Sequence, residues 1–303
     1  MERYPADMTD FMDMFPTEDA CLEYLSLLRW PDGYACLRCG SRQYWKKARG
    51  LFACRDCGYE ASVTVGTLFQ DTHKPLRFWF QAIWYVVNQK NGVSALGLQR
   101  AMGFSRYQTT WEWLHKLRRA MVRPGRDKLS GLVEVDETLI GGAHSGKRGR
   151  GAEGKSLVFI AAEEADRGIG RIRLSLLANA SAASLTKAVQ ETIEPGSQVR
   201  SDGWAGYNDL PRYGYTHSPT SHKDAASGDA TPLAHRVAAL LQRWWLGTHQ
   251  GAISPQHLAY YLDEFTFRFN RRTSRSRGKL FHRLVEGALQ INPVPAEMLK
   301  HKM

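Results

Sequence analysis

The sequence lacks the two features that direct a chain into or across a membrane. No segment approaches the ~18 uninterrupted apolar residues that a membrane-spanning helix needs. The N-terminus, MERYPADMTDF, also lacks a basic region followed by an apolar run, so we expect neither a membrane span nor a signal peptide. These absences predict a cytoplasmic protein with no membrane partner.

Acidic residues are scarce relative to basic ones. The 303 residues include 41 Lys and Arg against 30 Asp and Glu, which gives a formal net charge of +11. Basic side chains near a phosphate backbone release condensed counterions, so this charge favours a polyanionic partner, although solubility explains part of it. With 43% hydrophobic residues the chain can bury a sizeable core, and its length predicts two or three structural units.

Cysteine is also scarce. The chain has five, an odd number that disfavours a disulfide framework, and four of them form two close pairs in CLRCGSRQYWKKARGLFACRDC, residues 36–57. Two such knuckles predict one structural Zn²⁺ held by Cys36, Cys39, Cys54 and Cys57. We expect Cys21, in a helix-like stretch, to be a core thiol. The segment YWKKARGLF between the knuckles is typical both of a ribbon that faces nucleic acid and of a small ribbon that fills its interior with aromatic rings.

Residues 92–121, GVSALGLQRAMGFSRYQTTWEWLHKLRRAM, predict a helix-turn-helix that follows a helix beginning near Pro75. The turn is Gly103-Phe104-Ser105, and we expect Ser105 to cap the second helix. The start of that helix would then enter the major groove and its later basic residues would contact phosphates. The expected DNA-binding residues are Arg106, Tyr107, Gln108, Thr109, Lys116, Arg118 and Arg119. A helical hairpin with no role in DNA binding is the alternative.

From residue 130 the pattern changes to strand, strand, strand, helix and strand, the order in which ribonuclease H-like domains begin. This order places Asp136 in the first strand and Asp202 at the end of the fourth, as neighbours. Alternation along the first strand puts Glu134 and Asp136 on one face and Glu137 on the other. Two adjacent carboxylates repel each other unless a divalent cation such as Mg²⁺ lies between them. A solvated charge on an edge strand is the alternative for any one of these acids.

Three motifs carry a family resemblance: VEVDETLIGG, SDGWAGY and RWWLGTHQGAISPQHLAYYLDEFTFRFNRR. They resemble the transposases of the IS1595 superfamily, called ISXO2-like, and the similarity extends along nearly the whole chain, including the zinc ribbon. The resemblance implies a DDE-type transposase of a bacterial insertion sequence. Such an enzyme binds terminal inverted repeats, hydrolyses a phosphodiester at the transposon end and directs the freed 3′-OH at target DNA. The resemblance also implies two catalytic Mg²⁺ or Mn²⁺ ions. The implied partners are the double-stranded DNA of the transposon end and that of the target, bound by a homodimer or larger assembly that associates with the nucleoid.

The resemblance also identifies a third catalytic position. Family members carry Glu, Asn or His there, usually followed seven residues later by Lys. PLAHRVAALLQRWW places His235 at this position and Gln242 where Lys is expected. The implied ligands of the catalytic Mg²⁺ or Mn²⁺ are therefore Asp136, Asp202 and His235, with Gln242 as a further catalytic position. A packed core histidine is the alternative for His235.

Two basic segments complete the expected DNA contacts. FRFNRRTSRSRGKLFHR, residues 267–283, is predicted to be a mobile segment that DNA orders, with contacts from Arg271, Arg272, Arg275 and Arg277. A glycine-rich loop at 144–155 is expected to hold DNA near Asp136 through Lys147 and Arg148. A merely solvated surface is the alternative for the first segment.

The predicted fold class is α/β (an α+β mix), with an N-terminal zinc ribbon and helix-turn-helix before a ribonuclease H-like catalytic domain. The expected segments are 1–70 for the N-terminal helix and zinc ribbon, 71–128 for the helical DNA-binding part, 129–290 for the catalytic domain and 291–303 for a tail. Two other functions remain open. One is a DNA-binding regulator derived from a transposase that has lost its chemistry, and the other is a ribonuclease H-like nuclease without strand transfer.

Overall fold

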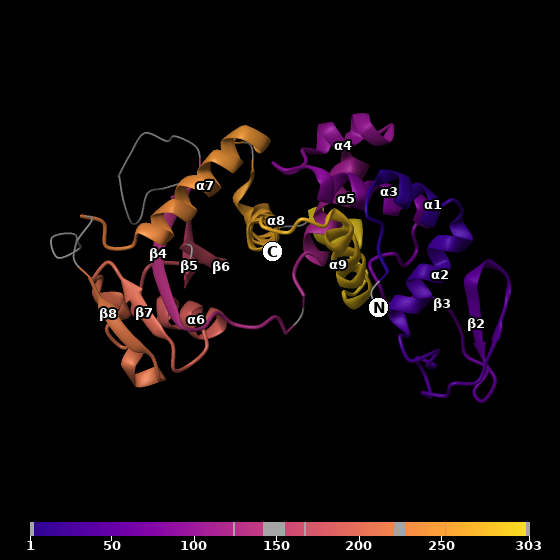
Figure 1. Ribbon diagram of the computed structural model, residues 1–303, viewed down its shortest axis with the longest axis horizontal. Helices are drawn as coiled ribbons and strands as arrows, with labels where there is room; N and C mark the ends of the chain where they lie inside the picture. The colour runs from indigo at the N-terminus through magenta and orange to yellow at the C-terminus, as the bar shows by residue number, and fades with distance from the viewer. Residues whose placement is uncertain are drawn as a thin grey trace. The chain divides into compact units, whose positions relative to one another are not determined.

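A computed structural model describes residues 3–123, 125–141, 155–166, 168–220, 228–251 and 253–300. The chain divides into two compact units (Figure 1). The first unit consists of Met1–Pro124 and Ser274–Lys302, and the second consists of Gly125–Thr273. Within the described part of the chain, no helix combines the length and the apolar character that crossing a membrane requires.

The first unit joins a small antiparallel sheet, in the order β1-β2-β3, to a set of helices. Its elements are α1 (Met8–Met14), α2 (Glu18–Arg29), β1 (Tyr44–Lys46), β2 (Leu51–Cys54), β3 (Glu60–Ser62), α3 (Leu76–Asn88), α4 (Ala95–Met102), α5 (Tyr107–Ala120), α9 (Arg277–Gln290) and α10 (Ala296–Lys300). Aromatic rings dominate the helical core. Phe15 of the α1–α2 connection packs edge-on against Phe80 of α3, with ring centroids 4.9 Å apart, and Phe281 of α9 contacts both.

Helix α9 belongs to the first unit, although the predicted catalytic segment 129–290 includes it. The helix packs on α3 and α5. Gly287 approaches the end of α5 so closely that a Cβ there would lie 2.1 Å from the carbonyl oxygen of Ala120. The predicted mobile segment 267–283 is largely helical, because it comprises the end of α8 (Leu258–Asn270), a short connection and the start of α9. Within this segment, residues from Arg277 onward belong to α9, whose apolar face is buried.

The predicted helix-turn-helix is formed by α4 and α5. Gly103 ends α4 in the left-handed region, with φ +66°, where glycine carries no steric penalty. The predicted cap at Ser105 is wrong, because the N-cap of α5 is Arg106 and its side chain makes no capping hydrogen bond. Phe104 is buried against Trp113, with ring centroids 5.0 Å apart, and the chain takes two further residues to reach the helix start.

The second unit is a five-stranded sheet covered by helices. Its strand order is β6-β5-β4-β7-β8, with β4 antiparallel to β5 and parallel to β7. Its elements are β4 (Leu132–Ile140), β5 (Ser156–Ala165), β6 (Gly168–Leu177), α6 (Ala182–Thr192), β7 (Gln198–Ser201), β8 (Thr216–Pro219), α7 (Pro232–His249) and α8. The predicted mixed α/β class with an N-terminal zinc ribbon is confirmed, and the second unit begins with the predicted order of three strands, a helix and a strand.

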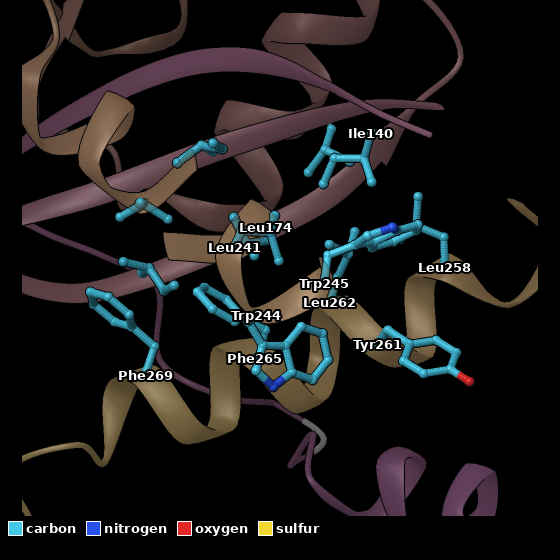
Figure 2. Packing of buried hydrophobic residues seen from close by; sticks show 14 of the residues in the cluster. Ile140, Leu174, Leu241, Trp244, Trp245, Leu258, Tyr261, Leu262, Phe265 and Phe269 are labelled. Carbon is cyan, nitrogen blue, oxygen red and sulfur yellow. The ribbon is translucent and has the colours of Figure 1, made fainter. Parts of the chain in front are cut away.

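The two faces of this sheet carry different helices. Val133 and Val135 of β4 face α6, whose Leu185 and Val189 pack against them. The opposite face packs on α7 and α8, and Figure 2 shows Trp244 and Trp245 of α7 beside residues of α8 in this core. Because side chains alternate along a strand, Glu134 and Asp136 of β4 share the face that α7 covers.

Candidate active site and zinc site

The four cysteines of the two knuckles converge in the zinc ribbon. Their Sγ atoms all lie within 4.8 Å of one another. The Cys36 and Cys57 sulfurs are 3.7 Å apart, and those of Cys39 and Cys54 are 3.6 Å apart. Tetrahedral Zn²⁺ with Zn–S bonds of ~2.3 Å separates its sulfur ligands by about 3.8 Å. The cluster therefore fits one Zn²⁺, as predicted.

The environment of the cysteines also suits a cation. Although burial opposes it, hydrogen bonds from the backbone N–H groups of Arg38 and Cys39 lower the pKa of Cys36 to about 6. Four adjacent sulfurs cannot all ionise without a cation among them. Cys21 lies outside this group, fully buried in α2, and burial raises the pKa of its thiol to about 12. Its predicted role as a core thiol is confirmed.

The segment between the knuckles has aromatic rings both in the interior of the ribbon and on its surface. Tyr34 and Phe52 of β2 are buried in the ribbon, and Tyr44 of β1, itself 39% exposed, packs against both rings. The next residue, Trp45, is 59% exposed and carries the guanidinium of Arg55 at 3.7 Å from its ring centroid. The outer face of the ribbon therefore presents an aromatic ring together with a cation.

The second site lies where β4, the end of β7 and the start of α7 meet. Asp136 is in β4, Asp202 directly follows β7, and His235 is in the first turn of α7. Nε2 of His235 lies 2.9 Å from Oδ2 of Asp136. The His235 side chain is 44% exposed, so it is not the packed core histidine that the sequence left open.

Electrostatics also link Asp136 with Asp202. Burial raises the pKa of the Asp136 carboxyl, and the charge of Asp202 raises it further. The backbone N–H of Glu137, His235 and the hydroxyl of Thr231 favour the ionised form and oppose this shift. Two carboxylates and an imidazole are a donor set that suits Mg²⁺ or Mn²⁺. Among the residues that the structure describes, however, the four cysteines are the one set of three or more ligand atoms that all lie within 4.8 Å of one another.

The sequence did not identify Asp229. Its Oδ1 lies 2.7 Å from Nδ1 of His235, so the imidazole bridges two carboxylates, Asp136 on one nitrogen and Asp229 on the other. A carboxylate on one ring nitrogen fixes the tautomer and orientation of the other nitrogen. The position of Asp229 just before Thr231-Pro232, a helix-start pattern, is the sequence feature that could have revealed it.

The remaining acids of β4 point to different partners. Glu137 lies on the α6 face, where its carboxylate accepts a hydrogen bond from the hydroxyl of Tyr207. Glu134 is fully buried on the face of Asp136 but pairs with Arg200 of β7 and with the start of α7. Gln242 lies on the exposed side of α7, two turns after His235.

The predicted DNA-binding residues of the first unit fall into two groups. Arg106 and Gln108 are exposed at the start of α5, and Thr109 is half-buried. Further along, burial lowers the pKa of Lys116, which nearby Glu112 partly offsets. Arg118 is only 2% exposed, so its predicted contact with phosphate is wrong. The start of α5 is therefore the accessible part of this helix.

The predicted DNA-binding arginines that follow α8 also differ in how far they are exposed and in what they contact. Arg271 stacks on Phe267, and Arg272 donates hydrogen bonds to the backbone carbonyls of Ile169 and Gly170 at the start of β6. Arg275 is exposed and Arg277 is half-buried at the start of α9. The predicted contacts at Lys147 and Arg148 lie outside the described residues.

Two segments of the chain match family models of transposases. Residues 128–270 match the family model of the ISXO2-like transposase domain, and residues 16–60 match that of the transposase zinc-ribbon domain. The chain belongs to this ISXO2-like (IS1595) transposase family, as its motifs predicted. It is also 26% identical, over 88% of its length and 94% of the relative, to an uncharacterized protein in transposable element ISH50 of Halobacterium salinarum.

Proposed function

We propose that the chain is a DDE-type transposase that binds the terminal inverted repeats of an insertion sequence, cleaves a strand at the transposon end and joins the freed 3′-OH to target DNA. The observation that carries this proposal is the contact between His235 of α7 and Asp136 of β4, beside Asp202. Three separate elements thereby contribute one group each to a single polar site in a family of transposases.

Asp136, Asp202 and His235 would hold the catalytic Mg²⁺ or Mn²⁺. When bound, the metal would stabilise charge on the attacking and leaving oxygens of an in-line displacement at phosphorus. Asp136 supplies a largely buried carboxylate, with a side chain 13% exposed, whereas the more exposed His235 faces the approaching DNA. Asp229 orients the imidazole by holding Nδ1, so that Nε2 points toward Asp136.

The first unit would recognise the transposon end. The exposed start of α5, with Arg106, Gln108 and Thr109, fits a recognition helix in the major groove. On the ribbon, the exposed Trp45–Arg55 pair offers stacking and phosphate contact at one place. Joining two transposon ends requires at least a dimer on DNA.

A strand-transfer assay tests this proposal. The full chain, loaded with Zn²⁺, is incubated with paired duplexes that carry the terminal repeats, with a target plasmid, and with Mg²⁺ or Mn²⁺. We expect 3′-end cleavage followed by joined products, and we expect neither with Asp136→Asn. The same assay separates the competing functions. Cleavage without joining would indicate a nuclease.

Specific binding of the terminal repeats without cleavage in either metal would contradict the proposal and indicate a DNA-binding regulator. Gln242, in place of the lysine expected from the family, is the feature that favours this second function. Because position 242 is exposed on α7, either the glutamine present or the lysine expected from the family could contact DNA there.

A further inference from the structure

We infer that Glu134 is a positioning residue whose buried carboxylate ties together β4 and α7, which carry Asp136 and His235, and β7, which Asp202 directly follows. This inference rests on the proposed function for the meaning of the site, although its geometry is independent of it. Glu134 does not contact the reacting groups. It holds the segments on which they lie.

Three contacts from two elements converge on the Glu134 carboxylate. Oε1 lies 3.0 Å from Nη1 of Arg200 in β7. Oε2 accepts hydrogen bonds from the backbone N–H groups of Leu233 at 2.6 Å and Ala234 at 3.2 Å, at the start of α7. The Glu134 side chain is 0% exposed, so no water competes for these contacts. Oε1 therefore binds β7, and Oε2 binds the start of α7.

The sequence spacing connects this carboxylate with the site. Glu134 is two residues before Asp136 on the same face of β4. Arg200 pairs with Glu134 in the parallel register of β4 and β7, and it is two residues before Asp202. Ala234 directly precedes His235. One carboxylate thus fixes the strand register and the helix start within two residues of every proposed metal ligand.

The start of α7 depends on this remote acid. Its N-cap, Thr231, makes no side-chain capping hydrogen bond, and its first residue is Pro232. The start of α3 is built in the same way: Pro75 is an N-cap without a side-chain hydrogen bond, and Glu18 of α2 accepts from the next two backbone N–H groups. Within the described residues, no candidate site lies at the start of α3. A change at Glu18 therefore shows the effect of losing a helix cap alone, without any effect on metal ligands.

The test compares Glu134→Gln with two matched variants in the full chain. Glu163→Gln alters the Glu163–Arg171 ion pair between β5 and β6 of the same sheet, in which Arg171 Nη2 lies 2.7 Å from Oε1. Glu18→Gln alters the corresponding cap of α3. Three quantities are measured: Mn²⁺ affinity by electron paramagnetic resonance, hydrogen exchange of the Leu233 and Ala234 amides, and strand cleavage over a series of Mn²⁺ concentrations.

For Glu134→Gln we expect ~10-fold to 100-fold weaker Mn²⁺ binding, the range typical of losing a group that orients metal ligands. We also expect several-fold faster exchange of the two amides, and slower cleavage that higher Mn²⁺ concentrations partly restore. The two matched variants should bind Mn²⁺ and cleave DNA close to the wild-type level. If Glu134→Gln loses thermal stability as Glu163→Gln does but binds Mn²⁺ normally, the inference is overturned.

Arg200→Gln provides a second route if Glu134→Gln does not fold, because it leaves the cap of α7 in place. It should weaken Mn²⁺ binding several-fold, and normal binding in this variant would also overturn the inference. The readouts keep the two proposals apart. A wild-type chain that binds Mn²⁺ but cleaves no DNA would contradict the proposed function, whereas the effect of Glu134→Gln on Mn²⁺ binding would still decide the role of Glu134.

Discussion

The cysteine cluster and the acidic site are assembled in opposite ways. The four cysteines lie within 22 positions of one another, on two knuckles that end in glycines with positive φ, and all four sulfurs gather within 4.8 Å. The acidic site draws Asp136, Asp202 and His235 from a strand, a loop and a helix, up to 99 positions apart. Local turns form the first site, whereas the second exists only when β4, β7 and α7 have packed.

This difference predicts how each site fails. A site made by local turns should depend on its metal for its own folding, because a small ribbon buries little apolar area. A site placed on a packed sheet should keep its shape when one ligand is replaced, because the hydrophobic cores on both faces hold the elements.

Zinc removal should have the largest effect. Structural Zn²⁺ contributes ~10–16 kcal/mol to the folding of small zinc domains. We therefore expect Cys36→Ser or chelation to unfold the ribbon and to abolish recognition of transposon ends, while the second unit stays folded. Zinc stoichiometry and hydrogen exchange of the two units measure this. Cys21→Ser makes the same change at a cysteine outside the cluster, so this variant should still bind one zinc ion in the ribbon. Purified wild-type protein without stoichiometric zinc would contradict the prediction.

Asp136→Asn and Asp202→Asn should each abolish strand cleavage and leave DNA binding intact. Each change removes the charge of a proposed metal ligand and no phosphate contact, so a loss of at least about a thousandfold, or ~4 kcal/mol in the barrier, is expected. Cleavage and gel-shift assays on the same DNA measure the two properties. Asp209→Asn, at an exposed aspartate of the same unit, is the control. Near-wild-type cleavage by either variant would exclude that aspartate from the site.

His235→Ala should reduce cleavage by several orders of magnitude with little change in the free energy of unfolding, because this side chain is partly exposed. Asp229→Asn should have a smaller effect, ~10-fold to 100-fold, since Asp229 only orients the imidazole. For both variants, cleavage assays measure the loss of activity and denaturant titrations measure the free energy of unfolding. Equal losses in both variants would mean that Asp229 does more than orient His235.

The glycines of α9 and α7 offer a contrast in packing. Gly287→Ala should destabilise the first unit by ~1–3 kcal/mol, because its Cβ would collide with the carbonyl of Ala120. Gly247→Ala in α7 has nothing within 4 Å of its Cβ and should stabilise that helix by ~0.5–1 kcal/mol. Thermal unfolding measures both changes. If Gly287→Ala leaves the midpoint unchanged or raises it, the close packing of α9 on α5 is not a constraint.

Gln242→Lys should give the smallest change. A lysine two turns after His235 adds an exposed cation next to the proposed DNA path, so binding and cleavage should rise modestly and become more sensitive to salt. Salt titrations of both activities measure the effect. Unchanged activity would mean that Arg236 or Arg243 already supplies the cation. A loss would mean that Gln242 makes a hydrogen bond of its own.

Much of the fold could be predicted from local patterns. The zinc knuckles, the α4–α5 turn and the order of strands and helix along the chain in the second unit each follow from spacing within short segments. The start of α5 could not be placed, because the burial of Phe104 against Trp113 shifts it past Ser105. The unit to which α9 belongs also could not be predicted from its position in the chain, since the helix packs on α5 and α3, which begin 170 and 201 positions earlier.

The residue types of both sites could be predicted from the sequence alone: four cysteines in two knuckles for zinc, and two aspartates and a histidine, proposed to hold the catalytic metal, in motifs of a transposase family. Spacing and alternation are local properties, so they also placed Glu134 and Asp136 on one face of β4. Three features could be seen only in the folded protein: Glu134 pairs with Arg200 and the start of α7, Asp229 holds His235, and Arg118 is buried. Those outcomes depend on which elements pack together, and packing joins residues whose distance along the chain carries no information about their contact.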